Sequence, residues 1–120
     1  MDLMELLGQK KSLSEHLKPL KDRIEKTLGK TIESYQIGVD MQKSEFRIQA
    51  DGKHQTEKSK MMCMMISTFL KKALKKRGKE NVSFSNIMLH ITDKSVAAAV
   101  KLTTNEIETL ELSSSEVVSV

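Results

Sequence analysis

The apolar residues of this chain first recur with the period of a helix. They fall three or four positions apart, at Leu13, Leu17, Leu20, Ile24 and Leu28. This spacing is the stripe of an amphipathic helix. Ser12 and Glu15 have the spacing of a capping box at its start, and Gly29 suits its end.

Pro19 conflicts with a regular helix over this whole stretch. A proline so far inside a helix removes a backbone hydrogen bond and costs about 3 kcal/mol, or bends the helix. One alternative is a helix that kinks near Glu15. The other is a regular helix that begins at Pro19, with Leu13 and Leu17 on a lead-in turn.

Beyond Gly29 the period changes to the alternation of strands. Apolar and polar side chains alternate over residues 35–41 and again over residues 46–50. About four polar residues around Gln42 and Lys43 separate the two runs, so they predict a β-hairpin.

A long helix is expected next, from Thr56 to Lys79. Thr56 suits its N-cap and Gly78 its C-terminal stop. At about 100° per residue, one broad apolar face gathers Met61, Met62, Met65, Ile66, Phe69, Leu70 and Ala73. These methionines are interpreted as core.

The remainder predicts two or three further strands. Val82 and Phe84 lie in one phase and Ile87, Leu89 and Ile91 in the other. A bulge or an offset start of the strand is therefore expected near residues 85–86. Asp93 and Lys94 make a turn before a strand over 96–102, and residues 107–112 predict a last edge strand.

These elements predict an α+β fold. We expect a mostly antiparallel, four- to five-stranded sheet with an N-terminal helix and a long central helix covering one face, in the order α-β-β-α-β-β-β. Residues 1–112 form a single domain. Residues 1–11 are a short N-terminal arm or helix, and residues 113–120 a flexible tail.

This order of elements is similar to that of the roadblock family of small dimeric adaptor domains, and of other profilin-like folds. The likeness concerns the order alone, so no site residue is carried over from the family.

Positive charge is concentrated at the end of the long helix. Residues 53–80 hold nine Lys and Arg against two Asp and Glu, and the whole chain has a net charge of +4. We expect the last turns to project past the sheet edge and to form a candidate contact for an anionic partner at Lys71, Lys72, Lys75, Lys76, Arg77 and Lys79.

Two interpretations of this basic end stay open. The cations complement the negative end of the helix dipole, or they contact the phosphate backbone of a nucleic acid without reading its sequence. Only one Arg and no aromatic residue accompany the lysines, which argues against base recognition.

A second candidate surface is apolar. The outward face of the hairpin formed by residues 82–102 carries small or apolar side chains, and Met64 lies on the polar side of the long helix. A protein partner or a second copy of the chain is therefore expected to bind at Met64, Met88, His90, Ala97 and Ala99.

Catalytic chemistry has little support in the sequence. The three histidines, His16, His54 and His90, lie on different predicted elements, and Cys63 is the only cysteine. It lies among methionines, where a thiolate is disfavoured. The five glycines are isolated, so no phosphate-binding loop is present. We expect no enzyme activity, cofactor or metal site.

Composition places the protein in the cell interior. With one cysteine no disulfide forms within a chain, which is typical of a reducing, cytoplasmic setting. No apolar run reaches the roughly 20 residues of a membrane span, and the acidic N-terminus is the reverse of a secretory signal.

The leading functional hypothesis is a non-enzymatic, homodimeric protein-interaction or adaptor module. The alternative is a sequence-nonspecific nucleic-acid-binding protein that uses the basic helix end. No membrane partner is expected.

Overall fold

The computed structural model describes residues 13–92 and 95–113. The predicted arm at residues 1–11, Ser12, the turn at residues 93–94 and residues 114–120 of the tail lie outside the described residues. The elements are α2 (Leu13–Leu28), β1 (Ser34–Asp40), β2 (Glu45–Ala50), β3 (Lys53–Lys58), α3 (Lys60–Lys76), β4 (Phe84–Thr92), β5 (Ser95–Leu102) and β6 (Ile107–Ser113). The predicted α+β class is confirmed.

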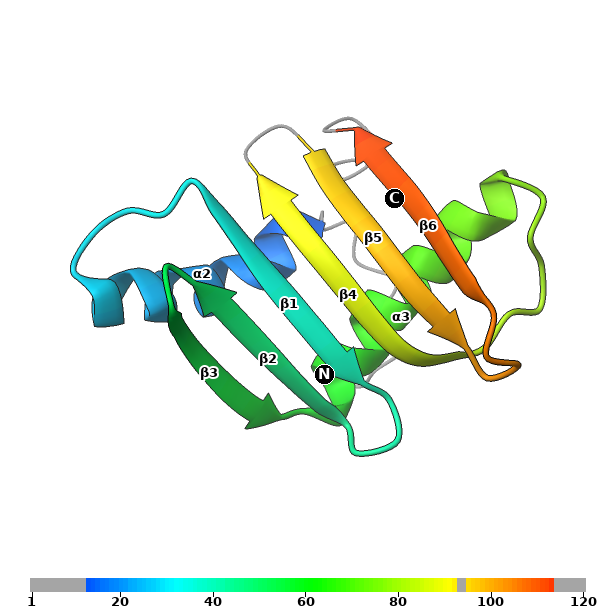
Figure 1. Ribbon diagram of the computed structural model, residues 1–120, viewed down its shortest axis with the longest axis horizontal. Helices are drawn as coiled ribbons and strands as arrows, with labels where there is room; N and C mark the ends of the chain where they lie inside the picture. Colours follow the sequence, from blue (N-terminus) through cyan, green and yellow to red (C-terminus); the bar gives the residue numbers. More distant parts are fainter. Residues whose placement is uncertain (1–12, 93–94, 114–120) are drawn as a thin grey trace.

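One six-stranded sheet carries the fold, in the order β3-β2-β1-β4-β5-β6, and every neighbouring pair is antiparallel. Helix α3 takes the chain from the edge strand β3 back to the middle of the sheet, where β4 pairs with β1. Both helices lie against the same face of the sheet (Figure 1), as the sequence predicted. No helix formed by residues 13–92 and 95–113 lies over the opposite face.

Strand β3 is missing from the sequence-based prediction. Its residues, KHQTEK, contain no apolar side chain, so no alternation marks it. Asp51 and Gly52 form the tight turn before it, with φ of 47° and 77°, as a two-residue hairpin requires. The observed order is α-β-β-β-α-β-β-β, one strand more than the order on which the likeness to the roadblock family rests.

Because of β3, helix α3 begins later than predicted. Thr56 lies in the strand, and Ser59 is the N-cap, with its hydroxyl oxygen accepting from the Met62 backbone N–H at 3.2 Å. The expected stop at Gly78 is confirmed. Gly78 has φ of 85° and donates to the Lys75 carbonyl at 3.0 Å, and Lys79 donates to the Leu74 carbonyl at 2.9 Å. These two bonds form a Schellman motif.

The buried face of α3 is rotated from the predicted one. Its members are Cys63, Met65, Ile66, Ser67, Phe69, Leu70, Ala73 and Leu74. The interpretation of Met61 as core is wrong, since 45% of it is exposed, and Met62 is only partly buried against the core. The sequence did not reveal this rotation, because methionine occupies both exposed and buried positions in the first turns of the helix.

Helix α2 is continuous from Leu13 to Leu28 with Pro19 inside it. The alternative of a helix that begins at Pro19 is therefore wrong. Leu17 and Ile24 are buried against the sheet, and Gly29 ends the helix with φ of 72°, as expected.

The strands alternate as predicted, with apolar side chains pointing to the helices. The expected bulge is confirmed by a register shift between Phe84 and Asn86 where β4 pairs with β5. The shift brings Phe84 into the core together with the later apolar residues of β4.

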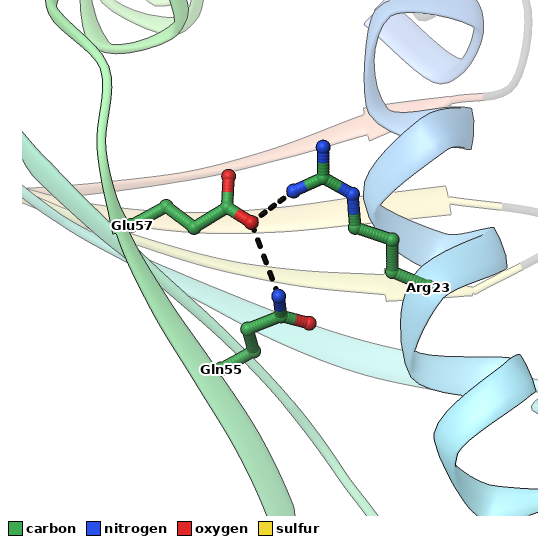
Figure 2. A network of polar contacts seen from close by, with 3 residues as sticks. All are labelled: Arg23, Gln55 and Glu57. Carbon is green, nitrogen blue, oxygen red and sulfur yellow. Dashed lines mark hydrogen bonds and ion pairs between the residues drawn. The ribbon is translucent and has the colours of Figure 1, made fainter.

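An ion pair joins α2 to the edge strand β3. Figure 2 shows Arg23 of α2 reaching toward Glu57 of β3, and the Glu57 carboxylate also accepts from the Gln55 side chain at 3.1 Å. Both ionic side chains are partly exposed, so their contribution to stability is about 1 kcal/mol or less. On this edge the helix contacts polar side chains instead of apolar ones.

Candidate functional site

The candidate site is the sheet face opposite α2 and α3, which neither of these described helices covers. The strand register arranges its outward side chains in three rows that run across the six strands, from β3 to β6. The end row is Lys58, Glu45, Asp40, Asn86, Lys101 and Ile107. The middle row is Thr56, Arg47, Gly38, Met88, Ala99 and Thr109. The third row is His54, Gln49, Gln36, His90, Ala97 and Glu111.

Four of the five predicted interface residues meet on this face. Met88 pairs with Ala99 and His90 with Ala97 across β4 and β5, and all four are exposed. Met64 is not among them, because it lies on α3, in the helix layer, and is partly buried. The structure thus divides the predicted set between two sides of the molecule.

The middle of the face is apolar and hollowed. Met88 is 50% exposed and Ile107 69% exposed, and both line a hollow of about 490 Å³ over β1, β2, β4, β5 and β6. Its floor is low at Gly38 and Ala99. The end of the Met88 side chain lies over Gly38, where an added Cβ would be 3.4 Å from the methyl carbon.

Charges on this face are balanced, and one opposite pair, Lys58 and Glu45, is adjacent in the register of β2 and β3. Lys58, Arg47 and Lys101 are offset by Asp40, Glu45 and Glu111, and Lys101 lies three strands away from Glu45. The Asp40 carboxylate accepts from the backbone N–H groups of Gln42 and Lys43 at 3.0 and 3.1 Å.

The basic end of α3 forms a separate surface. Figure 1 shows the C-terminal turns of this helix emerging past β6, as the sequence predicted. A groove of about 370 Å³ is lined by Lys71, Lys72, Lys75 and Lys79, together with the loop residues 80–82. Four of the six predicted cationic contacts therefore converge on one groove.

The other two predicted cationic contacts, Lys76 and Arg77, do not line this groove. Lys76 is exposed outside the groove. The Arg77 guanidinium donates to the carbonyls of Ala73 at 3.0 Å and Glu111 at 3.2 Å, and so ties α3 to the edge strand β6. Lys79 also contacts Glu108 at 3.6 Å. Arg77 thus has a structural role that the sequence does not reveal.

The three histidines lie on three different elements, and the cysteine is buried in the core. His16, His54 and His90 lie on α2, β3 and β4. Cys63 is 1% exposed, and burial, with the nearby charge of Asp40, raises the pKa of its thiol. The expectation that a thiolate is disfavoured here is confirmed.

One small hollow does bring His90 near an acid. It measures about 170 Å³ and is also lined by Ser34 and Asp51, which is below the usual size of ligand pockets. Asp51 pairs with Lys30 at 2.9 Å, and no hydrogen bond joins His90 to Ser34 or Asp51. Within residues 13–92 and 95–113, no group of three His, Cys, Asp or Glu side chains has the geometry of a metal site.

The sequence did not predict that this surface includes Ile107, Gly38, Glu45 and Lys101. The alternation within each strand gives the outward position of these residues. The pairing of β4 with β1, which brings Met88 beside Gly38, depends on the path of α3 and has no local signal.

The chain matches no known protein family, and no curated protein or solved structure is significantly similar to it. Among the helices that the structure describes, none has the length and apolar character needed to cross a bilayer.

Proposed function

We propose that this protein is a non-enzymatic interaction module that associates with a second copy of itself through the uncovered sheet face. The observation that carries the proposal is the apolar, hollowed middle of this face. Met88 and Ile107 are two of the three large hydrophobic residues exposed in the described part of the chain, and both line this hollow, Met88 from the middle row and Ile107 from the end row. Antiparallel sheets commonly leave one face to water, but that face is then polar.

A reducing, intracellular setting is part of this proposal. Cys63 is a free, buried thiol, which is compatible with a protein that has no disulfide to maintain.

Met88→Glu tests this surface. A carboxylate at the centre of the face would lose its hydration when it is buried against the second copy, and we expect the dimer to weaken by about tenfold or more. Sedimentation velocity over a range of protein concentrations measures the association. Met88 is half exposed in the single copy, so folding should be retained.

Met61→Glu is the matched control, because Met61 is a methionine of similar exposure in the helix layer. Its association should equal that of the wild type. Equal effects of the two substitutions would contradict the assignment of the surface, and a wild type that stays monomeric throughout would contradict self-association.

A second candidate function is binding of nucleic acid through its phosphates. The convergence of Lys71, Lys72, Lys75 and Lys79 on one groove favours it over scattered surface charge. Such binding would be nearly sequence-blind and would weaken steeply with salt, since each phosphate contact releases condensed counterions.

The triple change Lys71→Glu, Lys75→Glu and Lys76→Glu tests this function. Fluorescence anisotropy with labelled DNA and RNA duplexes at two salt concentrations should show binding by the wild type and none by the variant. Unchanged binding by the variant would refute the assignment, as would a wild-type affinity that does not respond to salt.

A further inference from the structure

The side chains of the uncovered face have a self-complementary order, and this order specifies how two copies pair. Sheets that pack face to face align their strands within about 30° of each other. Closed dimers have twofold symmetry. For two identical sheets in full overlap, the twofold axis of an aligned pair runs either along the strands or across them.

One possible axis runs along the strands, between β1 and β4. Each row of one copy then faces the same row of the second copy, with the strand order reversed. The pairs then follow from the strand order: β1 faces β4, β2 faces β5, and β3 faces β6. In the middle row, Met88 faces Gly38 of the second copy, and Arg47 faces Ala99.

This arrangement places large side chains over the floor of the hollow. Ala99 is one of the smallest lining residues of the hollow, and the flexible Arg47 side chain opposite it has the length to reach in. Over Gly38, which the Met88 side chain of the same chain already covers, the Met88 side chains of the two copies meet. In the third row, Gln49 similarly faces Ala97. The hollow of each copy is thus partly filled by the other.

Opposite charges also meet. In the end row, Lys101 of β5 faces Glu45 of β2 in the second copy, and the contact occurs twice in the dimer. Within one chain these two residues lie three strands apart, or about 14 Å at the usual strand spacing. Lys101 is exposed and Glu45 partly buried, so both are placed to reach across an interface.

The other axis is disfavoured by charge. An axis across the strands would reverse each strand about the middle row, so that Arg47 would face Arg47 and Met88 would face Met88. Like charges brought together in an interface oppose association.

The size of the face is adequate for a dimer. Six strands about 4.8 Å apart span about 24 Å, and three rows about 7 Å apart span about 14 Å. With the width of the outermost side chains the patch covers roughly 500 Å² per partner, or about 1,000 Å² in total, which is the lower end for a specific interface.

We infer that the protein forms a face-to-face homodimer whose twofold axis runs along the strands, with Lys101 of each copy against Glu45 of the other. The inference rests on the proposed function and specifies the geometry of the association. Reciprocal charge reversal tests it, because the two residues are in different chains at each contact.

Lys101→Glu and Glu45→Lys should each weaken the homodimer by about tenfold or more, since each creates two like-charge contacts. An equimolar mixture of the two variants should associate as tightly as the wild type. In that heterodimer one contact is the native Lys–Glu pair and the other is its reverse. Sedimentation equilibrium of the mixture, and capture of one variant by an affinity-tagged copy of the other, measure this.

Controls of the same charge change lie outside the face. Lys60→Glu, on α3, and Glu106→Lys, in the loop before β6, are exposed and should associate like the wild type, alone and mixed. Circular dichroism and thermal unfolding of each variant verify folding.

The outcomes separate the pairing from the proposed function. The pairing is supported if each variant alone associates weakly and the equimolar mixture associates as tightly as the wild type. A mixture that stays dissociated, or single variants that dimerise normally, overturns this pairing while self-association of the wild type stands. A wild type that is monomeric at every concentration overturns both, and indicates that another occupant, such as residues 1–12 of the same chain, covers the face.

Discussion

At the scale of single residues, burial explains the most unusual titration in the protein. Tyr35 of β1 is 6% exposed. Burial, together with the charge of Glu25, raises the pKa of its phenol to about 12. Glu25 is held nearby by accepting from the Ile32 backbone N–H at 3.2 Å.

The raised pKa of Tyr35 predicts an alkaline loss of stability. The fold favours the neutral phenol. Its contribution to the free energy of unfolding is therefore complete below pH 10, the ordinary pKa of tyrosine, and disappears as pH rises through about 12. A difference between pKa 10 and about 12 corresponds to at most about 3 kcal/mol. Urea unfolding across this range should show a steeper loss for the wild type than for Tyr35→Phe.

Tyr35 is the only tyrosine, so tyrosinate absorbance reports it directly. The midpoint should lie near pH 12 in the native protein and near 10 in urea. Part of the alkaline loss will remain in Tyr35→Phe, because the pKa of Cys63 is also raised. A native midpoint near 10 would mean that the phenol is accessible to water.

At the scale of elements, the boundary between β3 and α3 shows how a helix start is decided. Thr56 and Ser59 are both acceptable N-cap residues. Pairing of Lys53–Lys58 with β2 keeps Thr56 extended, so the first residue free to cap is Ser59.

Alanine substitutions distinguish these two positions. Ser59→Ala removes the bond to the Met62 N–H and should cost about 1 kcal/mol of the free energy of unfolding. Thr56→Ala changes an exposed position of an edge strand and should stay within about 0.5 kcal/mol. Urea denaturation with an unchanged slope measures both. A larger loss for Thr56→Ala than for Ser59→Ala would place the cap at Thr56.

At the scale of the whole molecule, the two helices on one face leave the other face as the main unassigned surface. A dimer through this face couples folding to concentration, because the second copy binds only the folded chain. The edges contribute differently: β3 is polar along its length, which discourages pairing with another strand.

Thermal unfolding at several protein concentrations reveals this coupling. The midpoint of the wild type should rise with concentration, whereas that of Met88→Glu should be lower and constant. Identical midpoints for the wild type at all concentrations would contradict a dimer that is coupled to folding.

The sequence predicted those features that depend on neighbours along the chain. The stripe of α2, the strand alternation, the bulge near Asn86 and the Gly78 stop were confirmed, because the side chains that decide them are local. The buried face of α3 was rotated from the predicted one. Strand β3 was not predicted, because a wholly polar edge strand has no alternation of apolar and polar residues. The Asp51-Gly52 turn was the available signal for it.

The sequence by itself determined α2, α3, the five strands other than β3, and the basic character of the helix end. Only the tertiary structure decided which outward residues become neighbours. The path of α3 places β4 beside β1, and so brings Met88 to Gly38 and sets Lys101 and Glu45 at equal distances from the centre of the face. Strand order depends on contacts between residues far apart in the chain, and no local pattern encodes it.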